Sequence, residues 1–173
     1  GLMEVENDGY GPDSAIVQLV NELNSEQSSH YVIAEPRAQR LGDDQIAVGL
    51  IYNRNRVKPL GHAHTLTEGP FRSGSRPPLA QVFEDKQTSK QFTVVVNHFK
   101  SKGSQCAEDV AEAPSEITTI QGSCNALRVS AAITLGDALS DESLPERKVI
   151  LGDLNAYSAE DPVAVLTDYT PES

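Results

Sequence analysis

Three polar clusters in the sequence contain residue types that could do chemistry, and each follows an apolar run. Their members are Glu4 in LMEVEND, Asn97 and His98 in VVVNHFKS, and Asp153 and Asn155 in VILGDLNAY. Carboxylate and amide oxygens are ligands for Mg²⁺ or Ca²⁺, and an imidazole can transfer a proton or bind a phosphate. Together these groups would suit metal-assisted chemistry on a phosphate, provided that the fold brings them to one place.

Each cluster also has a structural explanation when it is taken alone. A carboxylate after a strand is usually a solvated turn residue, and an Asp-x-Asn sequence often forms an Asx turn or caps a helix. A histidine that ends an apolar strand is more often hydrogen-bonded scaffold than catalyst. The functional interpretation therefore depends on convergence, because strand ends at one edge of a layered α/β protein meet there and bind ligands.

The elements that must position these residues are mainly strands, with helices between them. The predicted strands are LMEVE, HYVIA, QIAVGLIY, LAQVFED, QFTVVVNHF and KVILGDLN. The continuous apolar run of QFTVVVNHF is typical of a strand that is covered on both faces. This order predicts a layered α/β sandwich, with two packed, mostly antiparallel or mixed β-sheets flanked by helices.

Apolar periodicity and turn residues predict three helices and two long loops. The first helix follows a cap at Asp13 or Ser14. Its apolar residues repeat as on one buried face: Ile16, Leu19, Val20 and Leu23. CNALRVSAAITLGDAL is the second helix, and DPVAVL is the third, with Pro162 near its first turn. The Gly- and Pro-rich residues 61–78 and the polar residues 100–122 are expected to be loops.

Length and composition restrict the class of protein. The chain has 173 residues, of which 25 are acidic and 14 basic, so its formal net charge is -11, and 38% of the residues are hydrophobic. That length suits one domain over residues 1–173 with its own core, and the composition excludes a disordered tail. No apolar run approaches the roughly 18 residues of a membrane helix, so no membrane partner is expected.

The charge is unevenly distributed along the chain. Residues 37–102 contain eleven basic and five acidic side chains, a net charge of +6, whereas the remainder contains three basic and twenty acidic ones, a net charge of -17. A basic middle segment could attract a polyanion such as nucleic acid. Scattered, solvated charge is the alternative interpretation.

Cys106 and Cys124 are the two cysteines, and they flank a polar stretch. They lack CxxC spacing and have no nearby histidine that would complete a zinc site. A disulfide between them would stabilise the fold by about 3 kcal/mol in the loop-entropy model, and it would imply an oxidising compartment. Two buried free thiols are the alternative to this disulfide.

Three motifs resemble those of the endonuclease/exonuclease/phosphatase superfamily, to which pancreatic deoxyribonuclease belongs. They are LMEVEN, VNHFKSKGS and GDLNAYSAEDP, in the order that the family has. The resemblance is closest to secreted bacterial extracellular nucleases and extends from Gly1 to about Pro162. It implies a secreted, possibly periplasmic, bacterial enzyme with DNA or another nucleic acid as its substrate.

The resemblance also implies roles for the polar clusters. Glu4 matches the carboxylate that ligates the divalent metal, which would be Mg²⁺, Ca²⁺ or Mn²⁺. Asp153 and Asn155 match the pair that orients the attacking water and binds the phosphate or the metal. His98 matches the imidazole that contacts the scissile phosphate. The implied reaction is metal-assisted hydrolysis of a phosphodiester.

Three further residues are assigned to substrate binding. Arg76 resembles an arginine that binds a substrate phosphate, and Tyr52 resembles a tyrosine that approaches the substrate backbone. Asn97 is assigned to positioning His98. These assignments are implied by the resemblance, and the positions of the three residues in the fold can be compared with them.

The chain departs from the family pattern at both ends. The family opens with a strand that bears a metal-site Asn and closes with an Asp-His pair, and the chain has no Asp-His dipeptide. We therefore expect a piece truncated before Gly1 and after Ser173, weak or inactive as a hydrolase on its own. Strand edges exposed by truncation could pair in self-association.

Two other functions remain open from the sequence. A phosphomonoesterase or a sphingomyelinase-like phosphodiesterase of the same superfamily would use the same core. A noncatalytic polyanion-binding module would use the basic segment alone, with the strand-end polar groups as structural residues. The secreted-nuclease motifs and the basic segment favour an extracellular DNA nuclease in the intact parent.

Overall fold

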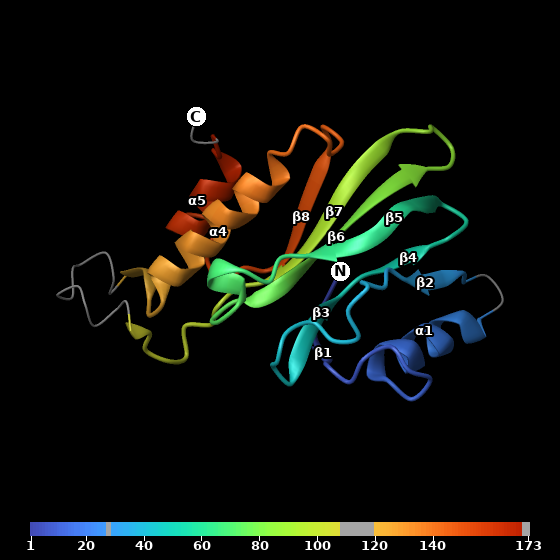
Figure 1. Cartoon of the computed structure of the whole chain (residues 1–173), viewed down its shortest axis with the longest axis horizontal. Coiled ribbons are helices and arrows are strands. Elements are labelled where there is room, and N and C mark those ends of the chain that lie inside the picture. The colour runs from blue at the N-terminus through green and yellow to red at the C-terminus, as the bar shows by residue number, and fades with distance from the viewer. Residues whose placement is uncertain (27–28, 108–119, 171–173) are drawn as a thin grey trace.

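Four layers are stacked in the computed structural model, which describes residues 1–26, 29–107 and 120–170 (Figure 1). One helix, two pairs of strands, a four-stranded sheet and two further helices follow one another across the molecule. The strands are β1 (Leu2–Glu6), β2 (Tyr31–Ile33), β3 (Ile46–Gly49), β4 (Ile51–Asn53), β5 (Val57–Thr65), β6 (Arg76–Asp85), β7 (Gln91–His98) and β8 (Lys148–Asp153). The helices are α1 (Ala15–Ser25), α4 (Asn125–Leu139) and α5 (Asp161–Thr167), with a short 3-10 helix η1 (Gly69–Phe71). The predicted layered α/β class is confirmed.

The four-stranded sheet has the order β5-β6-β7-β8, in which β5, β6 and β7 are antiparallel and β8 is parallel to β7. The facing layer consists of two separate antiparallel pairs, β1 with β3 and β2 with β4. The sequence predicted one strand over QIAVGLIY, but the chain changes partner at Leu50. Residues up to Gly49 pair with β1, whereas Ile51–Asn53 pair with β2, and the Leu50 carbonyl already accepts a hydrogen bond from the Ala34 amide after β2, at 2.8 Å.

Two apolar clusters hold the layers together, one on each face of the four-stranded sheet. Leu79, Phe83 and Val96 pack with β3 residues between the strand layers. On the other face, Val95 packs with α4 residues such as Leu135. Neighbouring residues of β7 thus enter opposite clusters, as the alternation of a strand requires. The prediction that this strand is covered on both faces is confirmed.

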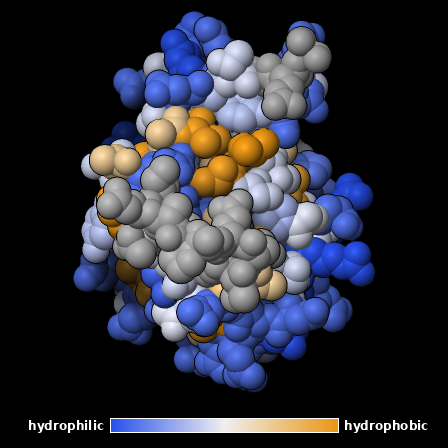
Figure 2. Space-filling model, turned by 90° about the vertical axis from the view of Figure 1, so that its left-hand side faces the viewer, coloured by the Kyte–Doolittle hydropathy of each residue, from blue (hydrophilic) through white to orange (hydrophobic). Residues whose placement is uncertain are grey.

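The helices α4 and α5 form the outer layer at one end of the molecule. Seen from that end, most of the visible surface is hydrophilic, with an apolar patch among the polar residues (Figure 2). Within α4, Ile133 is 44% exposed, while Ala131 and Ala132 beside it are fully buried. No helix among the described residues is long and apolar enough to cross a bilayer.

The first helix is less buried than its apolar period predicted. Ile16 and Val20 are buried, whereas Leu19 and Leu23 are 39% and 36% exposed. The expected buried face was therefore too wide, because α1 is the outermost layer and contacts the strands along a narrow stripe. Its N-cap residue is Ser14, but the Ala15 amide donates to the carboxylate of Asp8 instead of to a cap side chain.

The Gly- and Pro-rich residues 61–78 are not the irregular excursion that the sequence predicted. Gly61 lies inside β5, where the register with β6 shifts between Leu60 and His64, and it has a φ of 74°. Residues 77 and 78, both proline, lie in β6 at a second register shift, where no ladder hydrogen bond from their nitrogens is needed. The glycines and prolines of this segment thus coincide with register shifts in two pairs of strands. The connection between β5 and β6 is confined to residues 66–75.

Cys106 and Cys124 form the predicted disulfide, with an S–S distance of 2.06 Å. Most of the predicted loop over residues 100–122 lies outside the described residues, which omit 108–119. The described part is organised by Arg128, which is fully buried. Its guanidinium donates to the carbonyls of Lys100 and Ser123 at 3.2 and 2.7 Å. The bridge and this guanidinium hold the segment after β7 against the start of α4.

β8 is the last strand of its sheet, and no described strand pairs with its outer edge. Val149 on this strand is 45% exposed. Self-association through the edge stays a prediction. We expect light scattering to give the mass of two chains, because unpaired strand edges readily pair. A monodisperse single chain at high concentration would contradict it.

Gly152 places β8 unusually close to β7, and this contact can be tested. A Cβ at Gly152 would lie 2.0 Å from the Asn97 carbonyl oxygen, and the φ of 130° is one that L side chains rarely adopt. We expect Gly152→Ala to lower the free energy of unfolding by about 3 kcal/mol or more, measured by urea denaturation. Gly11→Ala is the control, because its Cβ would meet nothing within 4 Å. Equal urea midpoints for the two variants would show that the close contact is absent.

Candidate active site

Arg76, His98 and Asp153 lie opposite one another on three adjacent strands. Arg76 at the start of β6 pairs with His98 at the end of β7, and His98 pairs with Asp153 at the end of β8. The His98 Nε2 atom is 3.9 Å from the Asp153 Oδ2 atom. We call these three residues the strand-end row. Parallel pairing of β7 and β8 brings the second and third polar clusters together, as the sequence predicted.

His98 is buried in this row, with 2% of its surface exposed. Burial lowers its pKa below the ordinary value of 6.5, and the positive charge of Arg76 lowers it further. The carboxylates of Asp153, Glu4 and Asp44 oppose this shift. Its Nδ1 atom has no hydrogen-bond partner among the described residues. The imidazole is therefore neutral at neutral pH, the form that can accept a proton.

Asp153 and Asn155 form the Asx turn that was the structural alternative for this cluster. The Asn155 amide donates to the Asp153 Oδ1 atom at 2.8 Å, and Asn155 has a φ of 47°. The Asn155 side chain donates from Nδ2 to the Phe99 carbonyl at 3.0 Å. These bonds leave Asp153 Oδ2 directed at His98, and its side chain is 50% exposed. The turn is thus structural and also fixes the acid beside the imidazole.

Glu4 joins the row from the facing layer of strands. It has a φ of 58° and lies where the register of β1 against β3 shifts, between Leu2 and Val5. Such a bulge re-aims a side chain, and backbone strain of this kind is found mostly at functional sites. Its negative charge is among those that oppose the lowering of the His98 pKa.

Arg76 is held by a residue that the sequence analysis missed. Its guanidinium forms an ion pair of 2.9 Å with Asp44, which lies in the loop before β3. That loop is fixed by the buried Asn7, whose side chain donates to the carbonyls of Leu41 and Asp44 at 3.0 and 2.9 Å. The sequence feature that could have drawn attention to Asn7 is its position as a polar residue directly after β1. No sequence signal singles out Asp44, because its partner Arg76 follows it only after 32 residues and a hairpin.

Two predicted site residues lie away from the row. Tyr52 packs against Phe83, with 5.1 Å between ring centroids, and burial raises its pKa. Phe83 is seven residues from Arg76 along β6, which corresponds to roughly 20 Å. Asn97 is fully buried and alternates with His98, so it faces the opposite side of the sheet. Its side chain donates to the Leu151 carbonyl at 3.4 Å, which ties β7 to β8.

The donor atoms near the row are of the type that a hard divalent cation prefers, but they are not grouped around one point. Glu4 and Asp153 offer carboxylate oxygens, and Asn155 uses its amide nitrogen toward Phe99, which turns its amide oxygen away from that contact. Within the described ranges, no three or more His, Cys, Asp or Glu side chains are grouped to hold a metal ion. The predicted metal ligands Glu4, Asp153 and Asn155 therefore stay a prediction.

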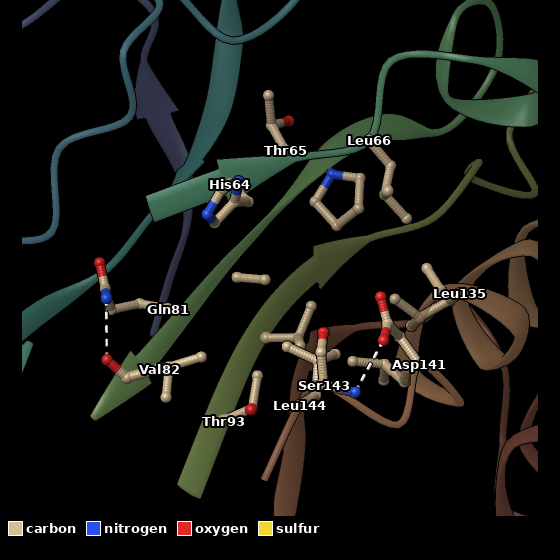
Figure 3. A pocket seen from close by; sticks show the side chains of 15 residues that line it. His64, Thr65, Leu66, Gln81, Val82, Thr93, Leu135, Asp141, Ser143 and Leu144 are labelled. Carbon is tan, nitrogen blue, oxygen red and sulfur yellow. Dashed lines mark hydrogen bonds between the residues drawn. The ribbon is translucent and has the colours of Figure 1, made fainter. Parts of the chain in front are cut away.

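A large apolar pocket lies elsewhere, between the sheet and the end of α4 (Figure 3). Its volume is about 310 Å³, and it is lined by residues such as Leu66, Val95 and Leu144. Val95 faces the helix layer, whereas His98 faces the strand layer, because residues three apart on a strand point to opposite sides. The pocket is thus separated from the strand-end row by the sheet itself.

The basic segment over residues 37–102 does not form one surface. The turns that join β4 to β5 and β6 to β7 lie at the end of the sheet opposite the row. Five basic residues of the segment lie at or beside these turns: Arg54, Arg56, Lys58, Lys86 and Lys90. Lys86 donates there to the Arg54 carbonyl at 2.6 Å. Of the two interpretations of the basic segment, this placement favours scattered, solvated charge, because the hairpins carry neighbours in sequence to opposite ends of the sheet.

The depressed pKa of His98 gives a pH dependence with a defined sign. Below pH 6.5 the unfolded chain takes up a proton at this residue while the folded chain does not. Stability therefore falls as the pH drops from 6.5 toward the folded pKa. We expect NMR titration in metal-free buffer to give His98 a pKa below 6.5. Because the Asp153 charge raises this pKa, Asp153→Asn should lower it further.

Asp168→Asn is the matched control for this titration, because Asp168 lies beyond α5 and does not contribute to the shift of His98. It should leave the His98 pKa unchanged. A His98 pKa at or above 6.5, or an increase in the Asp153→Asn variant, would contradict the geometry of the row.

Comparison with known proteins places this arrangement in a recognised fold. No protein-family model and no curated protein sequence matches the chain. Among solved structures, an endonuclease/exonuclease/phosphatase from Bacteroides vulgatus superposes with a TM-score of 0.55 at 17% identity, covering 95% of this chain and 54% of that one. The human Nocturnin catalytic domain with bound sulfate has a TM-score of 0.51 at 16% identity, covering 87% and 51%.

TDP2 of D. rerio, complexed with a single-strand DNA product, also superposes, with a TM-score of 0.51 at 13% identity, covering 95% of this chain and 50% of that one. The chain thus spans about half the length of these structures. The strand layers, the flanking helices and these superpositions agree with the resemblance seen in the sequence motifs. The chain has the fold of the endonuclease/exonuclease/phosphatase proteins.

Proposed function

We propose that this chain contributes the core of the active site of a divalent-metal-dependent phosphodiester hydrolase, which in the whole protein is an extracellular DNA nuclease. The observation that carries the proposal is the strand-end row, in which a buried neutral imidazole lies between an arginine and a half-exposed aspartate. This combination supplies a proton acceptor, an acid that orients it and a cation for phosphate.

His98 and Asp153 are proposed to handle the proton. With its pKa lowered, the imidazole is neutral and can take a proton from an attacking water. The imidazolium so formed would be stabilised by Asp153, whose Oδ2 atom is 3.9 Å from Nε2. The Asx turn keeps that oxygen in place, so little reorganisation accompanies the transfer.

Arg76 is proposed to bind a nonbridging phosphate oxygen. It is now paired with Asp44 at 2.9 Å, so a phosphate would share or replace that carboxylate. Glu4, Asp153 and Asn155 are the residues that would hold a divalent cation. When bound, such a cation supplies Lewis acidity that offsets negative charge on the phosphate.

Nucleic acid is the substrate class that the comparisons favour. TDP2 of D. rerio was crystallised with a single-strand DNA product, and human Nocturnin with sulfate, a tetrahedral oxyanion like a phosphate group. The disulfide between Cys106 and Cys124 supports an oxidising, extracellular location. The polyanion-binding alternative loses its main support, since the basic residues do not share one surface.

Metal binding is the direct test, because it is measured without turnover. Mn²⁺ added to the protein should enhance water-proton relaxation, and the double variant Glu4→Gln, Asp153→Asn should bind it at least tenfold more weakly, since both carboxylates are removed. Glu84→Gln, at the far end of β6, is the control and should bind as the original chain does. Equal binding by all three proteins would overturn the metal assignment.

Turnover is measured with duplex DNA, single-stranded DNA, RNA, sphingomyelin and a phosphomonoester, each with Mg²⁺ and with EDTA. We expect slow, Mg²⁺-dependent cleavage of DNA that falls by roughly 10²- to 10⁴-fold in His98→Ala. Preference for sphingomyelin or for the phosphomonoester would replace the nuclease proposal. Cleavage that persists in EDTA and in His98→Ala would contradict the mechanism.

A further inference from the structure

Tyr157 is an exposed aromatic side chain next to the proposed active site. Its exposed fraction is 78%. It follows Asn155 by two residues, so its backbone is within about 7 Å of that of the Asx turn. Because one exposed apolar side chain is common on protein surfaces, its neighbours decide whether the ring has a role.

A surface pocket connects this ring to the row. Its volume is about 250 Å³, and it is lined by Lys102, Asp153, Asn155, Ala156 and Tyr157. The pocket therefore brings together the acid that faces His98 and the exposed ring. A ligand whose reacting group lies at Asp153 could extend directly over Tyr157.

Lys102 covers one face of the Tyr157 ring, with its Nζ atom 4.8 Å from the ring centroid. The same Nζ donates to both carboxylate oxygens of Glu160, at 2.6 and 2.7 Å. Its charge is thus already neutralised by a side chain that is 10% exposed. The remaining ring face offers a flat apolar surface without free charge, which suits a neutral planar group better than a phosphate.

The ring stands on a rigid frame. The Glu160 amide donates to the Tyr157 carbonyl at 2.9 Å, and the Asp161 amide donates to the Gln121 side chain at 2.9 Å. Gln121 in turn accepts a bond from the buried Arg128 through its carbonyl, at 3.0 Å. Little conformational entropy is lost when a ligand meets a surface that is already fixed.

From this geometry we propose that Tyr157 is a stacking platform for a nucleobase of single-stranded nucleic acid, adjacent to the phosphate that Arg76, His98 and Asp153 act upon. The location of that phosphate rests on the proposed function, whereas the stack itself does not. Every base has an aromatic face, so one exposed ring binds a strand with little sequence preference. The substrate class is accordingly a strand with at least one unpaired base beside the scissile bond.

The test is binding of a fluorescein-labelled single-stranded DNA in EDTA, so that no hydrolysis occurs. A matched oligonucleotide with abasic sites has the same phosphates without bases. We expect Tyr157→Ala to weaken binding of the normal strand about tenfold, the effect of losing one base stack, and to leave the abasic strand unaffected. Tyr157→Phe keeps the ring and should bind as the original chain does.

Leu19→Ala, another exposed apolar side chain but on α1, is the control for general surface effects. Four results would overturn the proposal: no binding of the normal strand, equal affinity of the original chain for both strands, an unchanged affinity in Tyr157→Ala, or an equal loss for both strands. Base-dependent binding without Mg²⁺-dependent cleavage would instead refute the hydrolase and leave the stack intact. Mg²⁺-dependent cleavage, together with an unchanged affinity of Tyr157→Ala for the normal strand, would refute the stack and support the hydrolase.

Discussion

The parallel contact between β7 and β8 is the constraint on which the rest of the site depends. Each strand ends in polar residues, and the pairing of His98 with Asp153 aligns those ends. Gly152 makes the alignment possible, because a side chain there would overlap the Asn97 carbonyl. Asn97, buried on the other face, donates across to β8. A shift of one residue in this register would turn Asp153 to the opposite face of the sheet, so Asp153 would no longer lie beside His98.

Burial and charge then decide the chemistry of the aligned groups. His98 lies between a cation and an anion, and burial together with the Arg76 charge outweighs the opposing carboxylates, so the pKa of His98 is lowered. Arg76 does not act as an isolated cation, because Asp44 and the buried Asn7 hold it in place. Behind Asp153, the disulfide, Arg128 and the Lys102–Glu160 pair brace the surface that bears Tyr157. The strand-end row and the proposed binding surface are therefore neighbours on one frame.

The net charge of residues 37–102 did not predict how positive charge is distributed on the surface of the molecule. The stretch of +6 in the sequence suggested a footprint for a polyanion, but antiparallel hairpins divide those residues between both ends of the sheet. Near the row, Arg76 and Lys102 are paired with the carboxylates of Asp44 and Glu160. The proposed binding of nucleic acid would rely on specific contacts more than on a broad positive field.

Alternation, turn residues and motifs are local properties of the chain, so the layered α/β class, the strand-end clusters and the cysteine pair were predictable without the structure. Residues 61–78 were wrongly predicted as a loop, since bulges inside paired strands use the same glycines and prolines as loops. Only the tertiary structure decided that Tyr52 lies away from the row, that Asp44 holds Arg76, and that Tyr157 is exposed beside Asp153. These relations join residues distant in sequence or depend on which side of a turn faces solvent, and strand pairing and packing alone fix them.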